Sequence, residues 1–153
     1  MSHLLKYILP VALSGFVIDR VSKIWIVDVI GLPVLGSVDV IPPYLNFRMA
    51  WNTGINFGLG SNGPEMTRWI LIALAVVICV GLMWWVLRQG RRELSLAAGL
   101  VIGGALGNAW DRFQWGAVAD FLNNGCCGFD NPFSYNLADV FVFAGAIRIA
   151  VRS

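Results

Sequence analysis

The sequence predicts an all-α membrane protein in which one domain, residues 1–153, crosses the bilayer as four transmembrane helices. Composition is the first indication: 58% of the residues are hydrophobic, 13% are charged and the mean hydropathy is +0.71, whereas soluble domains average about 25% charged residues. The second indication is a set of four apolar segments separated by polar or basic stretches. We expect helices at about 4–30, 69–87, 94–110 and 136–151.

The first segment, 4–30, is apolar except for charged residues in its second half. A cleaved signal peptide is the alternative, but the charges lie at the wrong end of the apolar run and no small-x-small cleavage pattern follows it. Asp19 and Lys23 are four residues apart, so they can neutralise one another on one helix face. Ionisable residues at membrane depth are often functional, so a structural pair and part of a site both remain open.

The stretch 31–66 is a polar excursion rich in Gly, Pro and Asn. Its short runs SVDVI and LNFRM are typical of strands, which predicts a strand or hairpin and a loop held at the membrane surface. The excursion also contains Asn52, Gly54 and Asn56. Because asparagine beside glycine is commonly a turn residue, a turn role and a functional role remain open for both asparagines.

The segment 69–87 is the most secure helix, because no charge interrupts it between Arg68 and Arg88 and it would span roughly 28 Å. The next segment, 94–110, carries a glycine at every fourth position, which leaves one face almost free of side chains. A neighbouring helix can therefore approach closely, and the last segment, 136–151, is one candidate for that neighbour. A second polar excursion, 113–134, lies between them.

The basic residues predict the orientation of the chain. Cytoplasmic loops carry an excess of Lys and Arg, and four crossings would place one basic group on a single side: Lys6, Arg88, Arg91, Arg92, Arg148 and Arg152. Both termini are therefore expected in the cytoplasm and both polar excursions outside. The formal net charge of +2 gives no reason to expect a nucleic-acid partner.

The sequence offers few metal ligands. His3 is the only histidine, which removes HExxH zinc hydrolysis and any Ser-His-Asp triad from consideration. The cysteines, Cys79 and the adjacent Cys126 and Cys127, show no CxxC spacing. We therefore expect no metal and no cofactor, while the redox state of the adjacent cysteines stays open.

Asp120 and Asp139 are the candidate reactive residues, because each lies among apolar neighbours where a carboxylate is costly. If they converge at the outer end of the helices, they would share one proton. The ionised member could then activate a water while the protonated member binds the carbonyl under attack, which suffices for amide hydrolysis. A proton or cation pathway and plain structural capping are the alternatives. Asn108, Asp111 and Arg112 cluster on one helix face at the same end.

Several motifs, taken together and in order, resemble the lipoprotein signal peptidases, the type II signal peptidases of bacteria. They are Asp19-x-x-x-Lys23, Asn52-Thr53-Gly54, Gly107-Asn108-Ala109-Trp110-Asp111-Arg112, Ala119-Asp120-Phe121 and Asn136-Leu137-Ala138-Asp139. The resemblance implies an aspartyl endopeptidase of the bacterial inner membrane, with a small extracytoplasmic β-sheet cradle formed by 31–66. It would remove signal peptides from diacylglyceryl-modified prolipoproteins before the lipidated cysteine, without a cofactor, and globomycin-like cyclic peptides would block it.

The resemblance also implies roles for individual residues. Asp120 and Asp139 match the catalytic pair. Substrate-binding or supporting positions are matched by Asn52, Gly54, Asn108, Arg112, Asn136 and Ala138, and structural polar positions by Asp19, Lys23 and Asp111. The chain departs from the family at Asn56, where a small apolar residue is usual, at Ala119, at Tyr135 and in the loop of Cys126 and Cys127.

Two other functions are weighed against a monomeric peptidase. A small transporter subunit could use Asp19, Asp111, Asp120 and Asp139 as a proton or cation relay, but such a relay needs carboxylates through the depth of the bilayer, and three of these lie near one edge. A structural membrane subunit could use the glycine face of 94–110 as a seam with a partner helix.

Overall fold

The computed structural model describes residues 2–54, 63–128 and 131–152, so Asn56 lies outside the described residues. Its elements in chain order are α1 (Ser2–Ile24), the π-helix η1 (Trp25–Val29), α2 (Leu32–Leu35), β1 (Ser37–Ile41), β2 (Leu45–Asn52), α3 (Gly63–Gln89), α4 (Arg92–Trp115), β3 (Val118–Asn123) and α5 (Leu137–Arg152). The four long helices coincide with the four expected segments, but α3 and α4 both extend several residues beyond the predicted 69–87 and 94–110.

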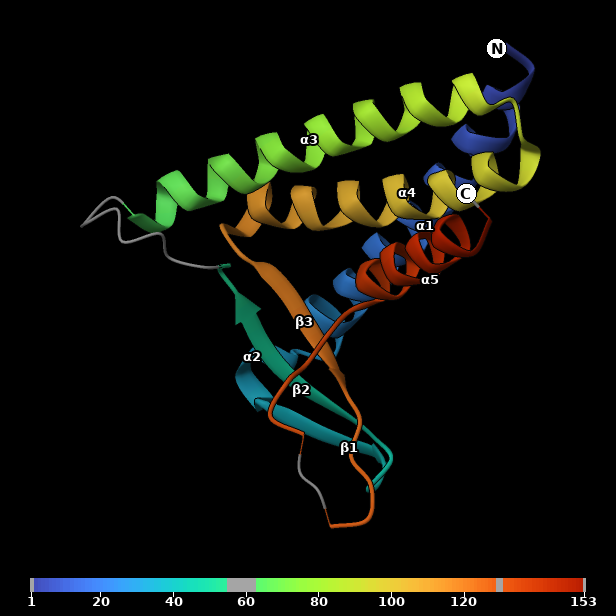
Figure 1. The fold of residues 1–153 in the computed structure, drawn as a ribbon. Helices are drawn as coiled ribbons and strands as arrows, with labels where there is room; N and C mark the ends of the chain where they lie inside the picture. The colour runs from blue at the N-terminus through green and yellow to red at the C-terminus, as the bar shows by residue number, and fades with distance from the viewer. Residues whose placement is uncertain (1, 55–62, 129–130, 153) are drawn as a thin grey trace.

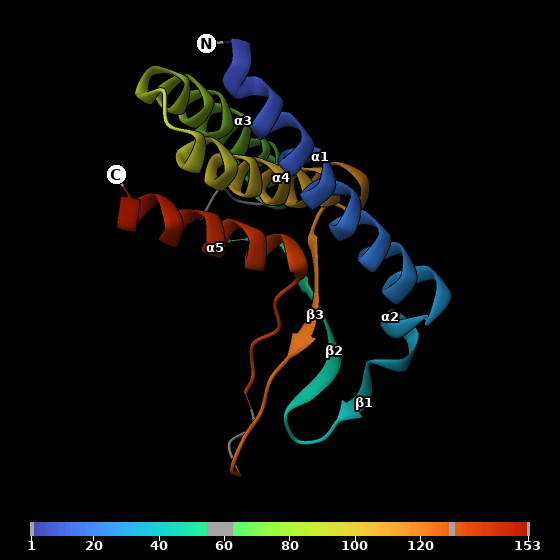
Figure 2. The same cartoon turned by 90° about the vertical axis from the view of Figure 1, so that its right-hand side faces the viewer.

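The four long helices lie together, and the sheet projects from one end of them (Figures 1 and 2). Helix α4 is central, because it packs against α1, α3 and α5 and also contacts β3. The two termini and the α3–α4 turn lie at the end away from the sheet. There Glu93 pairs with Arg148 and Arg152 of α5, at 3.2 and 3.4 Å. The basic residues used to predict orientation therefore gather at one end of the molecule.

The helices expose large apolar side chains and bury several charged ones. Leu13 of α1, Val77 of α3 and Phe143 of α5 are 64%, 67% and 70% exposed, whereas Asp19 and Lys23 are completely buried. Lys and Asp are almost never fully buried unless paired, and these two side chains pair with each other at 2.9 Å. Among the described helices, α3 is the one whose length and apolar composition alone suffice for a membrane span. Helix α5 has 16 residues.

The glycine stripe of α4, which the sequence offered as a packing face for a neighbouring helix, packs mainly against α1. A Cβ added at Gly103 would lie 2.5 Å from the Ala12 carbonyl oxygen of α1. At Gly107 it would lie 2.5 Å from Asp19 Oδ2. Helix α5 instead approaches Gly104, where an added Cβ would collide with the carbonyl of Ala138. Because successive helical residues are rotated by about 100°, α4 offers two adjacent glycine faces and holds one helix on each.

The sheet has three antiparallel strands in the order β1-β2-β3. The strands expected in 31–66 are present as β1 and β2, and the second excursion supplies β3, which the sequence pattern did not indicate. Ala50 pairs with Asp120, and Asn52 with Val118. Phe121 packs beneath the sheet in a cluster with Ile26 and Leu32. Asp120 is consequently fixed by strand pairing.

We expect Gly103→Ala to destabilise the protein, because the new methyl group would meet the backbone of α1 and overpacking costs about 1–3 kcal/mol. The matched control is Gly81→Ala in α3, where an added Cβ meets nothing within 4 Å and alanine is the better helix former. Thermal unfolding in detergent should show a lower Tm for Gly103→Ala and an equal or higher Tm for Gly81→Ala. Equal effects at the two positions would contradict the packing assigned to α4.

Candidate active site

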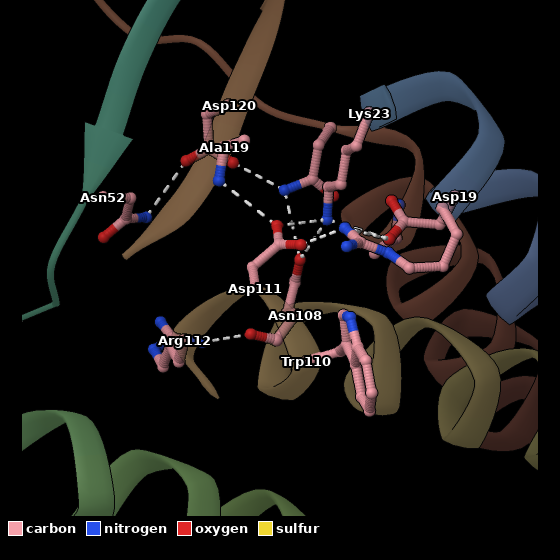
Figure 3. A network of polar contacts seen from close by, with 12 residues as sticks. Asp19, Lys23, Asn52, Asn108, Trp110, Asp111, Arg112, Ala119 and Asp120 are labelled. Carbon is pink, nitrogen blue, oxygen red and sulfur yellow. Dashed lines mark hydrogen bonds and ion pairs between the residues drawn. The ribbon is translucent and has the colours of Figure 1, made fainter. Parts of the chain in front are cut away.

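Asp120 lies in β3 and is 4% exposed, with both carboxylate oxygens hydrogen-bonded (Figure 3). Asn52 of β2 donates from Nδ2 to Asp120 Oδ2 at 3.1 Å. Asn136 donates from Nδ2 to Asp120 Oδ1 at 2.5 Å. The carboxyl group is thus held between the sheet and the start of α5.

The surroundings of Asp120 favour its protonated form. Burial, and next the negative charge of Asp139, raise the pKa of Asp120 from 3.8 to about 6. The hydrogen bonds from Asn52 and Asn136 and the charge of Lys23 oppose this rise. Because desolvation disfavours a charged carboxylate, this group can hold a proton at a pH where an ordinary aspartate has lost it.

Gly54 determines which way the Asn52 amide points. Its backbone N–H donates to Asn52 Oδ1 at 3.0 Å, which leaves the amide nitrogen of Asn52 facing Asp120. Gly54 has φ of +83°, a region that favours glycine. An added Cβ there would also lie 2.5 Å from Leu71 Cδ1. Asn52 is therefore a turn residue that also donates a hydrogen bond to the carboxyl group of Asp120. The turn role and the functional role that the sequence left open for it are compatible.

Asp139 lies in the first turn of α5, where it and Asn136 cap the helix reciprocally. The Asp139 N–H donates to Asn136 Oδ1 at 3.0 Å, and the Asn136 N–H donates to Asp139 Oδ2 at 3.1 Å. This is the geometry of a capping box built from Asn and Asp. The positive end of a helix dipole stabilises a carboxylate in this position, so Asp139 is suited to carry the negative charge.

Asn136 joins the two carboxyl groups. Its side chain binds Asp120, its backbone N–H binds Asp139, and it is completely buried. Asn108 of α4 completes the link, donating from Nδ2 to Asp139 Oδ1 at 2.8 Å and accepting from Asn136 Nδ2 at 3.2 Å. Residues that are distant in the sequence, on α4, β3 and α5, thus meet in one hydrogen-bonded group.

A buried ion cluster lies next to this group, between α1 and α4 (Figure 3). Lys23 pairs with Asp19 at 2.9 Å and with Asp111 at 2.7 Å. Arg20 pairs with Asp111 and stacks over Trp115, 5.3 Å from the ring centroid. The sequence-based site omitted Arg20; the signal available for it was a second basic residue inside the same apolar segment as Lys23.

Arg112 and Ala138 are placed differently from the other residues carried over. Arg112 Nη1 donates to the Asn108 carbonyl at 3.4 Å, and within the described part of the chain it forms no ion pair. Ala138 is completely buried and donates its N–H to Asp19 Oδ1 at 3.0 Å. It is therefore a packing and capping position at the start of α5.

An apolar cavity of about 380 Å³ opens beside Asp139. Tyr135, Val140, Phe143 and Ala144 form the rest of its lining. Among the described residues, no group of three or more His, Cys, Asp or Glu side chains is arranged to hold a metal ion. Cys126 and Cys127, in the loop after β3, are joined by a disulfide.

Comparisons with known proteins agree with one another. Residues 11–153 match the family model described as signal peptidase (SPase) II. The lipoprotein signal peptidase of Methylobacterium sp. (strain 4-46) is 34% identical, with 95% of this chain and 87% of the relative covered. That of Nitrobacter hamburgensis is 36% identical, with 93% and 88% covered.

The fold also matches solved structures. One, described as a bacterial membrane enzyme at 1.9 Å resolution, superposes with a TM-score of 0.78 and 27% identity, over 94% of this chain and 90% of that one. A second, at 2.3 Å, gives a TM-score of 0.76 at the same identity, over 94% and 85%. The family model covers nearly the whole chain and the relatives exceed 30% identity. The chain therefore belongs to the signal peptidase II family of aspartic peptidases.

Proposed function

We propose that this chain cuts the signal peptide from diacylglyceryl-modified prolipoproteins, immediately before the lipidated cysteine, using Asp120 and Asp139 as the catalytic pair. The observation that carries the proposal is the shared partner Asn136, which binds both carboxyl groups at the end of a helical bundle that is apolar outside. Membership of the family favours a peptidase over the transporter alternative.

In the proposed reaction, Asp139 is ionised and Asp120 is protonated. Asp139 takes a proton from water as the water oxygen bonds to the scissile carbonyl carbon, and Asp120 donates a hydrogen bond to the carbonyl oxygen. The tetrahedral intermediate then collapses: the proton on Asp139 passes to the amide nitrogen and the C–N bond breaks. Asn52, Asn108 and Asn136 hold the two carboxyl groups in position, and Gly54 and Ala138 support this arrangement.

Arg112 is assigned to the substrate. The guanidinium group of Arg112 donates one hydrogen bond to the Asn108 carbonyl. Its buried Nε has no hydrogen-bond partner among the described residues. Buried polar groups are normally satisfied, so a substrate carbonyl is a suitable acceptor for this group.

The distribution of charged residues and the apolar helix surfaces support the proposed membrane setting. All four long helices cross the bacterial inner membrane in this proposal, with both termini in the cytoplasm and the sheet outside as a cradle for the substrate. The basic residues around Glu93, at the end opposite the sheet, support this orientation. The substrate's acyl chains stay in lipid because removing them costs about 0.8 kcal/mol per CH₂.

The same site would take a globomycin-like cyclic peptide, since the apolar cavity lies directly against Asp139. The glycine face considered as a seam for a partner is covered by α1 of the same chain, which supports a monomer. Residues 1–153 then act as a single peptidase domain.

We expect the purified protein to shorten a diacylglyceryl prolipoprotein and to leave the unlipidated form of the same precursor intact, because only the lipid anchors the cleavage site at the outer leaflet. Mass spectrometry of both products after equal incubation checks this. Equal cleavage of the two precursors would contradict the lipid requirement, and uncoupled proton or cation flux in proteoliposomes would favour a transporter.

We expect Asp120→Asn and Asp139→Asn each to lower the cleavage rate by about 10³-fold or more, because each removes one of the two proton-transfer groups. Asp39→Asn on β1 is the matched control: it neutralises an exposed aspartate at the sheet and should leave the rate unchanged. Turnover in detergent micelles, with Tm as the check on folding, measures the effect. Wild-type turnover in either Asp120→Asn or Asp139→Asn would contradict the proposed mechanism.

The raised pKa of Asp120 predicts a pH profile. The group must be protonated, and its pKa is about 6 in the free enzyme, so kcat/KM should be high below pH 6 and fall about tenfold per pH unit above it. Asn52 stabilises the ionised form, so Asn52→Ala should move this limb to higher pH. A limb at the ordinary value of 3.8 would contradict the assignment of the proton.

A further inference from the structure

Lys23 lies against three oxygen atoms of three different side chains. Its ammonium group is completely buried and has three N–H donors. The nitrogen donates to Asp19 Oδ2 at 2.9 Å and to Asn108 Oδ1 at 3.1 Å, and it forms an ion pair with Asp111 Oδ2 at 2.7 Å. Figure 3 shows Lys23 with Asp19 and Asp111 on either side and Asn108 below. One side chain from α1 is thereby tied to two points on α4.

The two aspartates that Lys23 joins each hold the chain next to a member of the catalytic pair. Asp19 Oδ1 accepts the N–H of Ala138 at 3.0 Å, immediately before Asp139. Asp111 Oδ2 accepts the N–H of Ala119 at 3.2 Å, immediately before Asp120. The backbone of α5 and the backbone of β3 are thus each pinned by a carboxylate, and Lys23 bridges the two carboxylates.

Lys23 also determines the direction of the Asn108 amide. Asn108 Oδ1 accepts from Lys23 and, at 3.2 Å, from Asn136 Nδ2. With both acceptor positions of the oxygen in use, the amide nitrogen is left to face Asp139 Oδ1 at 2.8 Å. A flipped amide would set its N–H₂ group against the ammonium and its oxygen against the carboxylate.

We infer that Lys23 is a positioning residue of the peptidase: it fixes the separation of the segments that carry Asp120 and Asp139 and orients the Asn108 amide toward Asp139. The inference rests on the proposed function, in which these aspartates are catalytic. Neutralising Asp19 would need only one of its three donors, and Arg20 already pairs with Asp111. The bond to Asn108 is therefore unexplained by charge balance alone.

The test is the double variant Asp19→Asn/Lys23→Met. It removes one positive and one negative charge together, so Arg20 and Asp111 remain paired, and the amide oxygen introduced at position 19 can still accept the N–H of Ala138. We expect kcat to fall about 10²-fold, as for a misplaced catalytic group, while KM stays within about twofold because substrate binding is not touched. Steady-state cleavage of a diacylglyceryl prolipoprotein gives both constants.

A second variant, Lys23→Arg, keeps the charge of the cluster. It replaces the ammonium group, which has three donors, by a planar guanidinium group, which cannot contact the same three acceptors. It should also lower kcat with KM unchanged. Val86→Ala in α3 is the control for stability: it opens the buried core away from the catalytic pair and should lower Tm while kcat stays at the wild-type value.

Wild-type kcat in either folded Lys23 variant would overturn the inference. So would an equal loss of kcat in Val86→Ala at the same folded fraction, because Lys23 would then act only through stability. Asp120→Asn measured in parallel separates this failure from that of the proposed function: if Asp120→Asn is active, the catalytic pair is wrong, and if it is inactive while the Lys23 variants are normal, only the role of Lys23 is wrong.

Discussion

The close approach of α1 and α5 to α4 is the constraint on which the rest of the structure depends. Gly103 and Gly107 allow the backbone and Asp19 of α1 to lie directly against α4, and Gly104 does the same for the start of α5. In lipid, helices gain little from hiding apolar surface, so packing of small residues and interhelical hydrogen bonds hold them together. Three elements that are distant in sequence can then place polar side chains within hydrogen-bond distance.

The close packing of α1 and α5 on α4 allows charged side chains to be buried, because it brings their partners within reach. Moving an ion into an apolar interior is costly, and only close partners with the remaining donors and acceptors satisfied compensate for the cost. Lys23 has three acceptors, and Asp19 and Asp111 each accept a backbone N–H as well as a cation. Asp120 differs: the hydrogen bonds to its carboxyl group come from neutral amides, and its pKa is raised. Burial is thus compensated by ion pairs at one place and raises the pKa of a carboxyl group at another.

Sequence reasoning located the four helices, the strands of 31–66 and the apolar setting of the aspartates, because each depends on local periodicity and composition. It did not decide which helix packs on the glycine stripe of α4, since a glycine repeat shows that a close neighbour exists without showing which one. It missed β3, because six residues flanked by turns in a polar excursion carry little strand signal. It also left Arg20 out of the polar group, although this residue pairs with Asp111 on another helix.

The sequence by itself determined the membrane composition, the end of the molecule at which positive charge gathers and the residue types available for chemistry, because these properties are sums over local segments. Only the tertiary structure decided that Asn136 binds both Asp120 and Asp139, that Gly54 orients Asn52 and that Lys23 links α1 to the start of both carboxylate-bearing segments. The reason is physical: hydrogen bonds fix atoms to within a fraction of an ångström, and which atoms meet depends on how whole helices pack.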